Sequence, residues 1–518
     1  MIISQFVFVP LSAAFLIAII GRKKENIAST IAMIATAWLF AASIIAFLKL
    51  PAADGLIIRN TSGWNAPFTI SLVLDNLSSF MLIVISLISL TSAFYALQYI
   101  NHFTGKWNFF ALFMLMVAGM NGVVLTGDFF NLYVFMEISL ISAYSLVAFG
   151  TEAEELEAAF KYATMGTITS TMILFGIGIL YSYTSTLNMA DVGLQLQRGG
   201  FPKLVFLVYG LFIAGFGLKT ALVPFHAWLP DAHPSAPAPI SAMLSGVLIK
   251  TLGVYAIVRI FFNVFNAPQV VLTIFLLLGT LSIVIGGLLS VVQWDFKRLL
   301  GFSSISQIGY VILGFALGTP LGILGGLLHL FYHAIFKSLL FLDSGAVEYA
   351  TGTRDLRKMG GLSKELKVTS STSMIGTLAI SGIPPFNGFF SKLIIIIACV
   401  QAGHIGLGII AALVSIVTLA YFLKVQKHAF YGVRKSAKIQ EKVPFTLKTA
   451  MIVLAVLCLV TSIFVIPSIK AVTFEPIEKC VTDRTKYINK ITEDKGFDKK
   501  YLDNELSNNT KEYSGSQK

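Results

Sequence analysis

The chain has 518 residues, of which 56% are hydrophobic and only 12% are charged. Soluble globular proteins carry about 25% charged residues, so this composition excludes a water-facing surface of the necessary size and predicts an integral membrane protein. The formal net charge is +12. Because the basic residues lie in short loops between apolar segments, that charge indicates cytoplasmic loops and not nucleic-acid binding.

Apolar runs long enough to cross a bilayer follow one another along the whole chain. They predict an all-α polytopic membrane protein with about fourteen transmembrane helices. The expected spans are 2–21, 27–48, 76–100, 107–125, 128–150, 157–182, 201–222, 238–262, 268–293, 299–318, 321–345, 369–400, 404–423 and 447–468. The span 299–318 has the weakest signal, because it is rich in Ser and Gly.

The distribution of Lys and Arg predicts the orientation. With the N-terminus outside, basic clusters such as 22–24, 354–367 and 427–442 fall in cytoplasmic loops, and few basic residues, Arg259 among them, fall in external loops. An even number of spans then places the C-terminus outside as well. The charged tail after Ile469 is expected to be a mobile or partner-bound extension.

Proline interrupts two of the expected spans. One contains LVPFHAWLP around Pro224, and the other contains SGIPPFNGFF around Pro385. Proline breaks helical hydrogen bonding, and at membrane depth the freed backbone groups need protein or water partners. Lys219 precedes the first break and Lys392 follows the second. This reversed order is what inverted repeats would produce.

The spans therefore suggest a division of the chain around two inverted five-helix repeats with broken seventh and twelfth helices. The expected segments are an N-terminal three-helix part with an external loop (1–106), a first repeat (107–262), a second repeat (268–423), a cytoplasmic loop with the final helix (424–468) and a polar tail (469–518). The pattern alone carries this division, because the two repeats have no residue-level similarity.

A single glutamate lies deep inside an apolar span. Glu137 is nine residues beyond Asp128, which at about 1.5 Å per residue places it roughly 13 Å into the membrane. A carboxylate at that depth costs about 2.5–3.5 kcal/mol unless it is protonated or meets a cation. We therefore expect Glu137 to bind a buried lysine and to control the release of its proton.

Four lysines also fall within apolar spans: Lys219, Lys250, Lys337 and Lys392. Burial disfavours the charged form of a lysine, so such residues can pass a proton on at physiological pH. Buried ion pairs are the alternative. For Lys250 and Lys337, which are expected near span ends, another alternative is that the side chains extend to the membrane surface.

His329 and His333 are spaced i, i+4 and share one helix face with Lys337. This pattern favours a proton or water wire, with hydrogen-bonded packing and a metal site as alternatives. No carboxylate or cysteine is placed to complete a metal shell, and the cysteines lack redox spacing, so neither a metal nor a cofactor is predicted. His226 and His233 are expected to serve either the broken helix or proton uptake, and Asp343 to lie at the interface.

The stretch GLKTALVPFHAWLPDAHPSAPAPISAMLSGVLIKTLGVYAIVR resembles the signature of the complex I antiporter-like family. HLFYHAIFKSLLFLDSG, WDFKRLLGFSSISQIGY and GIPPFNGFFSK match the same family in order and spacing. The resemblance covers about residues 60–430. It implies that Glu137 and Lys219 form an ion pair, that Lys250 and Lys337 are central relay residues beside His329 and His333, and that Lys392 ends the exit half-channel.

Within that family, SGWNAPFTISLVLDNLSSFML is most similar to the D-type member of Mrp-type Na⁺/H⁺ antiporters and to its membrane-bound hydrogenase relatives. The resemblance implies a proton-translocating subunit in the cell membrane, with other membrane subunits, H⁺ and, in an antiporter, Na⁺ as partners. The alternative is a pumping subunit of a hydrogenase or complex I-like redox assembly. Ser306 and Gln307 replace the family's usual His or Glu.

Overall fold

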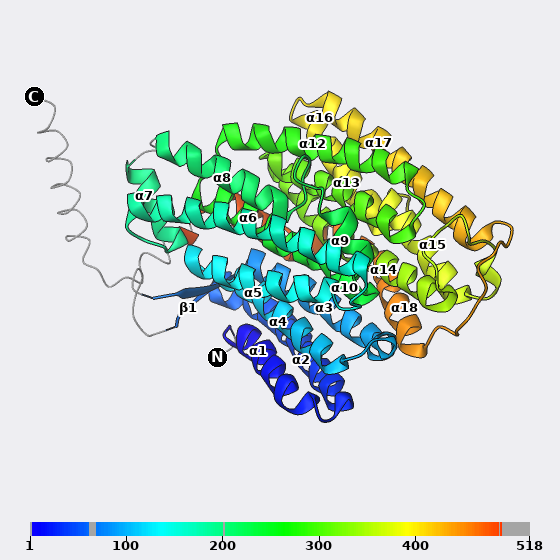
Figure 1. Ribbon diagram of the computed structural model, residues 1–518. Coiled ribbons are helices and arrows are strands. Elements are labelled where there is room, and N and C mark those ends of the chain that lie inside the picture. Colours follow the sequence, from blue (N-terminus) through cyan, green and yellow to red (C-terminus); the bar gives the residue numbers. More distant parts are fainter. Residues whose placement is uncertain (1–2, 62–68, 200–202, 486, 489–518) are drawn as a thin grey trace, which may run out of the picture.

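The apolar runs of the sequence form long helices that lie side by side along one axis (Figure 1). The structure is a computed structural model that describes residues 3–61, 69–199, 203–485 and 487–488. In a bilayer only a helix satisfies its backbone hydrogen bonds within one segment, which explains the architecture. Within the described residues, eleven helices are long and apolar enough to cross a membrane. The count of fourteen spans and the repeat boundaries stay predictions.

The first part of the chain contributes nine helices and a small hairpin. These are α1 (Gln5–Leu16), α2 (Glu25–Lys49), β1 (Leu56–Asn60), β2 (Ser71–Asp75), α3 (Asn76–Tyr99), α4 (Lys106–Leu125), α5 (Phe129–Val147), α6 (Ala153–Thr184), α7 (Met189–Gly199), α8 (Lys203–Lys219) and α9 (Leu229–Ser235). The antiparallel strands pair Leu56 with Asp75, and they form in a region that was expected to be an external loop.

The second part contributes the remaining helices. These are α10 (Ala238–Met243), the π-helical turns η4 (Leu244–Leu248), η5 (Lys250–Tyr255) and η6 (Arg259–Val264) around α11 (Ala256–Val258), then α12 (Gln269–Val292), α13 (Phe296–Ala316), α14 (Pro320–Thr351), α15 (Lys367–Ser381), α16 (Asn387–Gln401), α17 (Ile405–Val425), η8 (Gln426–Tyr431), α18 (Phe445–Val460), α19 (Pro467–Thr473) and α20 (Glu475–Thr482). The Ser- and Gly-rich span is confirmed as the helix α13, in which the Gln307 side chain is buried.

Both predicted helix breaks are present. α8 ends at Lys219 before α9 begins at Leu229, and α15 ends at Ser381 before α16 begins at Asn387. Side chains bind backbone groups that the breaks release: Trp228 donates from Nε1 to the Leu218 carbonyl at 2.9 Å. The breaks thus bring polar groups into the interior of the bundle.

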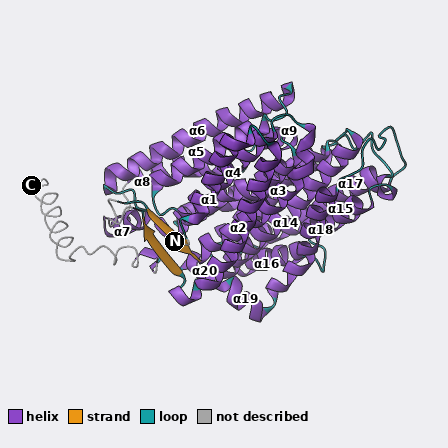
Figure 2. Ribbon diagram, turned by 90° about the horizontal axis from the view of Figure 1, so that it is seen from below, coloured by secondary structure: helices purple, strands orange, loops and turns teal. Residues whose placement is uncertain are grey.

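The segment after the final span folds back onto the bundle. Phe474, Ile477 and Val481 are buried against it, and the Cys480 carbonyl accepts a hydrogen bond from Asn263 at 2.9 Å. Figure 2 shows α20 beside the β1–β2 hairpin. The prediction of a mobile extension is therefore wrong for α20, because its apolar side chains find a docking surface, whereas 489–518 lie outside the described residues.

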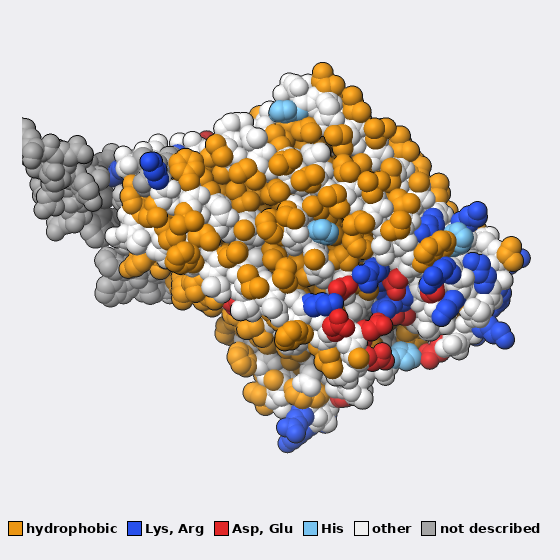
Figure 3. Space-filling view, turned by 45° about the horizontal axis from the view of Figure 1, so that its top comes forward, with side chains coloured by type: hydrophobic (Ala, Val, Ile, Leu, Met, Phe, Trp, Pro, Cys, Tyr) orange, Lys and Arg blue, Asp and Glu red, His pale blue; other side chains and the backbone are white. Residues whose placement is uncertain are grey.

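Hydrophobic side chains cover most of the surface seen in Figure 3, and the charged side chains gather towards one end. That end carries the loops before α15 and between η8 and α18, which are the predicted cytoplasmic loops. The hairpin and α20 lie at the opposite end. This polarity agrees with the orientation inferred from the basic residues.

Candidate functional site

A serine hydroxyl joins Glu137 to Lys219. Ser170 on α6 donates to Oε1 of Glu137 on α5, and Lys219 at the end of α8 donates from Nζ to Ser170 Oγ at 2.7 Å and to the Gly166 carbonyl at 3.2 Å. The two charged residues are thus brought together through a hydroxyl instead of a direct contact. Lys219 is buried, but Glu137 is only half-buried, on the outer face of α5.

Lys250 lies fully inside the protein at the π-helical part of its span. Its Nζ donates to the carbonyls of Ser245 and Gly246 at 2.6 and 2.7 Å. A π turn shifts the backbone hydrogen-bond pattern, so these carbonyls are free to accept from a side chain. A neutral amine has two N–H groups, which two carbonyls satisfy completely. Burial at 0% exposure excludes extension to the chain's surface.

His329, His333 and Lys337 lie on one face of α14, and all three are fully buried. The two imidazole centroids are 6.3 Å apart. His329 Nδ1 is 2.9 Å from Ser391 Oγ, and Lys337 donates to Ser303 Oγ. Both nitrogens of His333 and Nε2 of His329 have no hydrogen-bond partner among the described residues. Burial also excludes extension of Lys337 to the surface.

Lys392 spans the second helix break. From the second turn of α16 it donates to the Ile380 carbonyl at 2.7 Å and to Ser415 Oγ at 3.2 Å, with its ammonium 4.9 Å from the centre of the Tyr310 ring. Ser415 in turn donates to the Ser381 carbonyl at 2.9 Å. The contacts resemble those of Lys219, since each lysine binds one carbonyl and one serine hydroxyl next to a break.

The predicted residues form two groups, with one gap between them. The first group is Glu137 and Lys219. The second contains the remaining residues, in which the Tyr310 ring lies between Lys392, whose Nζ is 4.9 Å from the ring centre, and the His329 ring, whose centroid is 5.6 Å away. In the described chain, neither a hydrogen bond nor an ion pair joins Lys219 to Lys250.

Two other ionisable residues lie inside the protein, which makes the prediction for Asp343 wrong and favours one of the two roles expected for His233. Asp343 was expected at the membrane interface, but it is fully buried, and Oδ1 accepts from Thr372 at 2.7 Å. His233 is also fully buried and packs between Trp228 and Phe341, which favours its structural role. Both residues are buried because α9 and the end of α14 lie under other parts of the chain instead of at the bundle surface.

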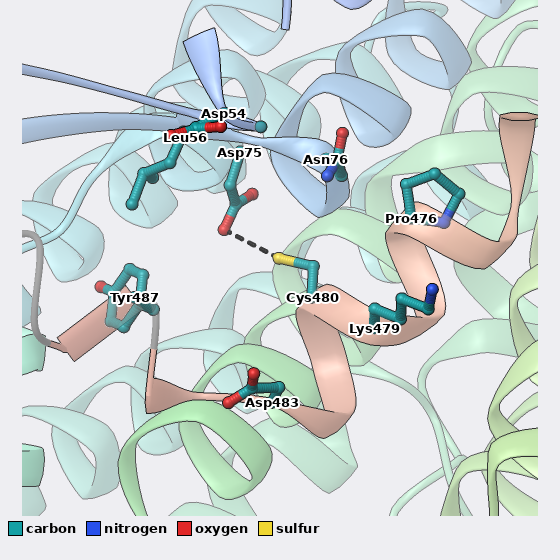
Figure 4. Close-up of a pocket in the computed structure, with 10 residues that line it drawn as sticks. Asp54, Leu56, Asp75, Asn76, Pro476, Lys479, Cys480, Asp483 and Tyr487 are labelled. Carbon is teal, nitrogen blue, oxygen red and sulfur yellow. Dashed lines mark hydrogen bonds between the residues drawn. The ribbon is translucent and has the colours of Figure 1, made fainter. Parts of the chain in front are cut away.

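Arg259 is a further correction, because it lies in the interior and not in an external loop. Its guanidinium forms a buried ion pair with Asp75 at 2.7 Å. Cys480 donates from Sγ to Asp75 Oδ2 at 3.3 Å, and Tyr487 lies over the guanidinium at 5.2 Å. Burial, followed by the Asp75 carboxylate, raises the pKa of Cys480 to about 12 and keeps its thiol protonated. Figure 4 shows Asp75, Cys480 and Tyr487 beside a cavity of about 450 Å³ at the end of the bundle.

Sequence reasoning missed Ser170, Ser303, Ser391 and Ser415, the hydroxyls that bind the charged residues. Serines are frequent throughout the spans, and spacing alone does not tell which of them faces a lysine on another helix. Among the described residues, no group of three His, Cys, Asp or Glu side chains could hold a metal ion.

Sequence comparison identifies the family. The family described as "NADH:quinone oxidoreductase/Mrp antiporter, TM" matches residues 126–418, and "NADH-Ubiquinone oxidoreductase (complex I), chain 5 N-terminus" matches residues 62–110. The D-type component of the Na⁺/H⁺ antiporter of Alkalihalophilus pseudofirmus is 36% identical over 75% of this chain and 78% of its own length. The N-type component of the NADH-quinone oxidoreductase of Desulforudis audaxviator is 37% identical over 71% and 74%.

Two solved structures have the same fold. A chain of the Mrp complex from Dietzia sp. DQ12-45-1b superposes with a TM-score of 0.87 at 28% identity, over 94% of this chain and 98% of that one. A chain of the membrane-bound sulfane sulfur reductase, an archaeal respiratory membrane complex, gives 0.87 at 30% identity, over 94% and 99%. Both neighbours are subunits of membrane complexes. This chain is a multi-pass membrane protein that belongs to the NADH:quinone oxidoreductase/Mrp antiporter transmembrane family.

Proposed function

We propose that this chain is the proton-translocating, antiporter-like subunit of a multi-subunit Mrp-type Na⁺/H⁺ antiporter in the cell membrane. The observation that carries the proposal is the set of buried lysines and histidines at the two helix breaks and between them. The residues that move H⁺ are Glu137, Lys219, Lys250, His329, His333, Lys337 and Lys392. The burial of the four lysines favours the neutral amine over the ammonium, so a buried lysine can release its proton at moderate cost.

The first transfer uses the serine bridge. One proton moves from the Lys219 ammonium to the Ser170 oxygen while the Ser170 hydroxyl proton moves to Glu137. The charged pair thereby becomes a neutral amine and a carboxylic acid, and the serine is regenerated. In a low-dielectric interior the separated charges and the neutral pair are closer in free energy than they would be in water.

A separate proton transfer uses the second group, along α14. Lys250 can hold its proton or release it without losing its two carbonyl contacts. Within the described chain, both ring nitrogens of His333 and Nε2 of His329 have no hydrogen-bond partner, which suits water molecules between them. Ser391, which contacts His329, is adjacent in sequence to Lys392, where the path reaches the second break.

Exchange in everted vesicles that contain the assembled complex tests this function. Lys392→Met and Glu137→Gln remove one titratable group each and should abolish proton movement while the complex still assembles. Lys392→Arg should also be impaired, since arginine retains its proton. Lys203→Met, which removes an exposed lysine at the start of α8, is the matched control. Wild-type exchange in either of the first two variants would refute the relay.

A redox assembly is the second candidate, favoured by the 37% identity to an NADH-quinone oxidoreductase component and by the respiratory complex with the same fold. The other subunits would then supply the driving reaction. Addition of Na⁺ to energised everted vesicles separates the two. An antiporter releases protons in response to Na⁺ alone, whereas a redox pump moves protons only with an electron donor.

A further inference from the structure

Four lysines meet around one cavity at the predicted cytoplasmic end of the bundle. The cavity has a volume of about 280 Å³, far above the roughly 10–15 Å³ that one water molecule needs. It lies between the start of α15, the loop after η8 and the start of α18. Its lysines are Lys364, Lys367, Lys442 and Lys448, and we call it the lysine cavity. Figure 3 shows Lys and Arg side chains gathered at this end of the molecule.

The two carboxylates that line the lysine cavity have other partners. Glu365 forms an ion pair with Arg434, and Glu441 Oε2 lies 3.4 Å from His102 Nε2. Within the part of the chain that the structure describes, none of the four lysines forms an ion pair or donates a hydrogen bond from its side chain. Ammonium groups around a shared cavity repel one another, and an anion between them removes this repulsion.

The start of α15 adds backbone donors to the same cavity. No side chain caps this helix, and its first hydrogen bond runs from the Ser370 amide to the Leu366 carbonyl at 2.8 Å. The amides of residues 367–369, which line the cavity, come before that bond and have no acceptor among the described residues. Such amides at the N-terminus of a fifteen-residue helix carry partial positive charge and bind anionic oxygens.

The lysine cavity also borders the lipid-facing surface of α18. Lys448 follows Phe445 by three residues and precedes Ile452 by four, so the three side chains share one face of the helix. Phe445 is 73% exposed and Ile452 is 44% exposed. Leu366 and Val443 add apolar atoms to the cavity lining. A ligand here meets positive charge at one end and hydrocarbon at the other, which suits a phospholipid better than a free phosphate.

Retention of basic residues in the cytoplasm explains the sign of the charge but not its arrangement. Lys23 and Lys24 satisfy the same rule in the loop between α1 and α2, where both are exposed. The lysine cavity instead combines lysines from three segments that are far apart in the sequence, next to an uncapped helix end. This convergence is a feature of the fold and indicates a binding site.

We propose that the lysine cavity binds the phosphate headgroup of an anionic phospholipid from the cytoplasmic leaflet, with the acyl chains of the lipid along the exposed face of α18. The ammonium groups and the amides at the start of α15 donate to the phosphate oxygens. A basic side chain near the membrane surface strengthens binding to anionic lipids by about five-fold. The site is separate from the proton relay and does not depend on it.

Quenching by brominated lipids tests the site in the assembled complex. With Cys399, Cys458 and Cys480 replaced by Ala, Phe445→Cys carries a fluorophore beside the lysine cavity, and the same complex without Phe445→Cys gives the background. The membranes contain phosphatidylglycerol and phosphatidylcholine, of which only one is brominated at a time. Quenching should show a preference for phosphatidylglycerol of at least about five-fold.

A second label position controls for the general lipid environment. Ile34→Cys lies on the exposed face of α2, outside the lysine cavity, and its fluorophore should show no preference between the two lipids. Equal quenching by the two lipids at Phe445→Cys would overturn the proposal.

Charge-matched variants locate the lipid, and inorganic phosphate identifies its chemistry. Lys367→Gln with Lys442→Gln removes two charges from the lysine cavity and should remove most of the preference at Phe445→Cys. Lys23→Gln with Lys24→Gln removes the same charge from another predicted cytoplasmic loop and should leave the preference unchanged. A preference that survives in the first pair would place the anionic lipid elsewhere and refute the site. Excess inorganic phosphate at constant ionic strength should not displace the lipid, and loss of the preference would show that the cavity takes the free anion instead.

Discussion

At the scale of single residues, the bridge through Ser170 decides how Glu137 controls Lys219. A direct ion pair between the two would hold the proton on lysine. The interposed hydroxyl accepts from one group and donates to the other, so a proton can cross without either side chain moving far. The same arrangement makes the pair sensitive to the loss of a single oxygen atom.

We therefore expect Ser170→Ala to slow proton exchange by about 10²-fold, the lower end of what a positioned proton-transfer group contributes. Ser170→Thr keeps the hydroxyl and should retain most of the activity. Ser145→Ala is the control, because that hydroxyl is exposed and binds only the Ile141 carbonyl of its own helix. Exchange measured in everted vesicles, normalised to assembled complex, gives the comparison. Equal rates in Ser170→Ala and Ser145→Ala would show that the bridge is dispensable.

The sequence was sufficient to find the charged residues of the site but not their polar partners. A lysine inside an apolar span stands out because its burial is costly. A serine there costs little and can bind its own helix, so Ser170 and Ser391 look like their many neighbours in the sequence. Only the packing of one helix against another selects them.

At the scale of the helices, the ion pair of Asp75 and Arg259 ties the outer end of the π-helical span to the β1–β2 hairpin. Removing one partner of a buried pair leaves a charge without compensation, which costs about 3–5 kcal/mol. Asp75→Asn should lower the free energy of unfolding of the purified complex by about that amount, which is measured as a fall in its thermal unfolding midpoint. Glu157→Gln, which breaks an exposed pair with Lys161, should leave the thermal midpoint close to that of the unmodified complex.

A double variant separates charge from packing at this pair. Asp75→Leu with Arg259→Met removes both charges together, and similar replacements in other proteins are often neutral or stabilising. The thermal midpoint of the double variant should therefore exceed that of Asp75→Asn. A double variant less stable than the single one would show that the hydrogen bonds of the pair, and not its charge balance, hold the hairpin.

The π-helical span also depends on a close approach at Gly246. A Cβ at this position would lie 2.2 Å from Ser338 Oγ, and the Gly246 carbonyl is one of the two acceptors of Lys250. Gly246→Ala should destabilise the protein by about 1–3 kcal/mol, as overpacking does, and reduce exchange. Adding Ser338→Ala removes the nearest atom and should restore much of both losses. Gly210→Ala, with no atom within 4 Å of the new Cβ, serves as the control.

The helices and breaks were predicted correctly where the chain is apolar or contains proline. The prediction failed at the end of the bundle that carries the β1–β2 hairpin and α20. The breaks follow from Pro224 and Pro385, whose chemistry is local. The folded-back α20 was missed because its mixed charges resemble those of a solvated tail. A signal was present, since Phe474, Ile477 and Val481 recur at helical spacing and predict one apolar face.

At the scale of the whole molecule, the two ends of the bundle differ in composition and in construction. The predicted cytoplasmic end holds ion pairs between loops far apart in sequence, such as that of Arg354 with Asp295 at 3.1 Å. The opposite end holds the hairpin and the returning C-terminal helices. Contacts at each end join segments that the span prediction had placed on the same side, so the fold and the predicted topology agree.

This agreement leads to a prediction about sidedness. Single cysteines at three exposed positions test it. Ser436→Cys is in the basic loop after η8, Ala52→Cys is just after α2, and Val472→Cys is on α19. Basic loops are retained in the cytoplasm, so an impermeant thiol reagent should reach Ser436→Cys only in everted vesicles. Ala52→Cys and Val472→Cys should react only in right-side-out vesicles, because the α20 segment that continues from α19 packs beside the hairpin. The parent chain, treated in parallel, corrects for the natural cysteines.

Two outcomes would contradict this arrangement. If Ala52→Cys and Val472→Cys reacted from different sides of the membrane, the fold would be wrong. If Ser436→Cys and Val472→Cys reacted from the same side, the chain between them would have to cross the membrane an even number of times, instead of the single crossing assigned to α18.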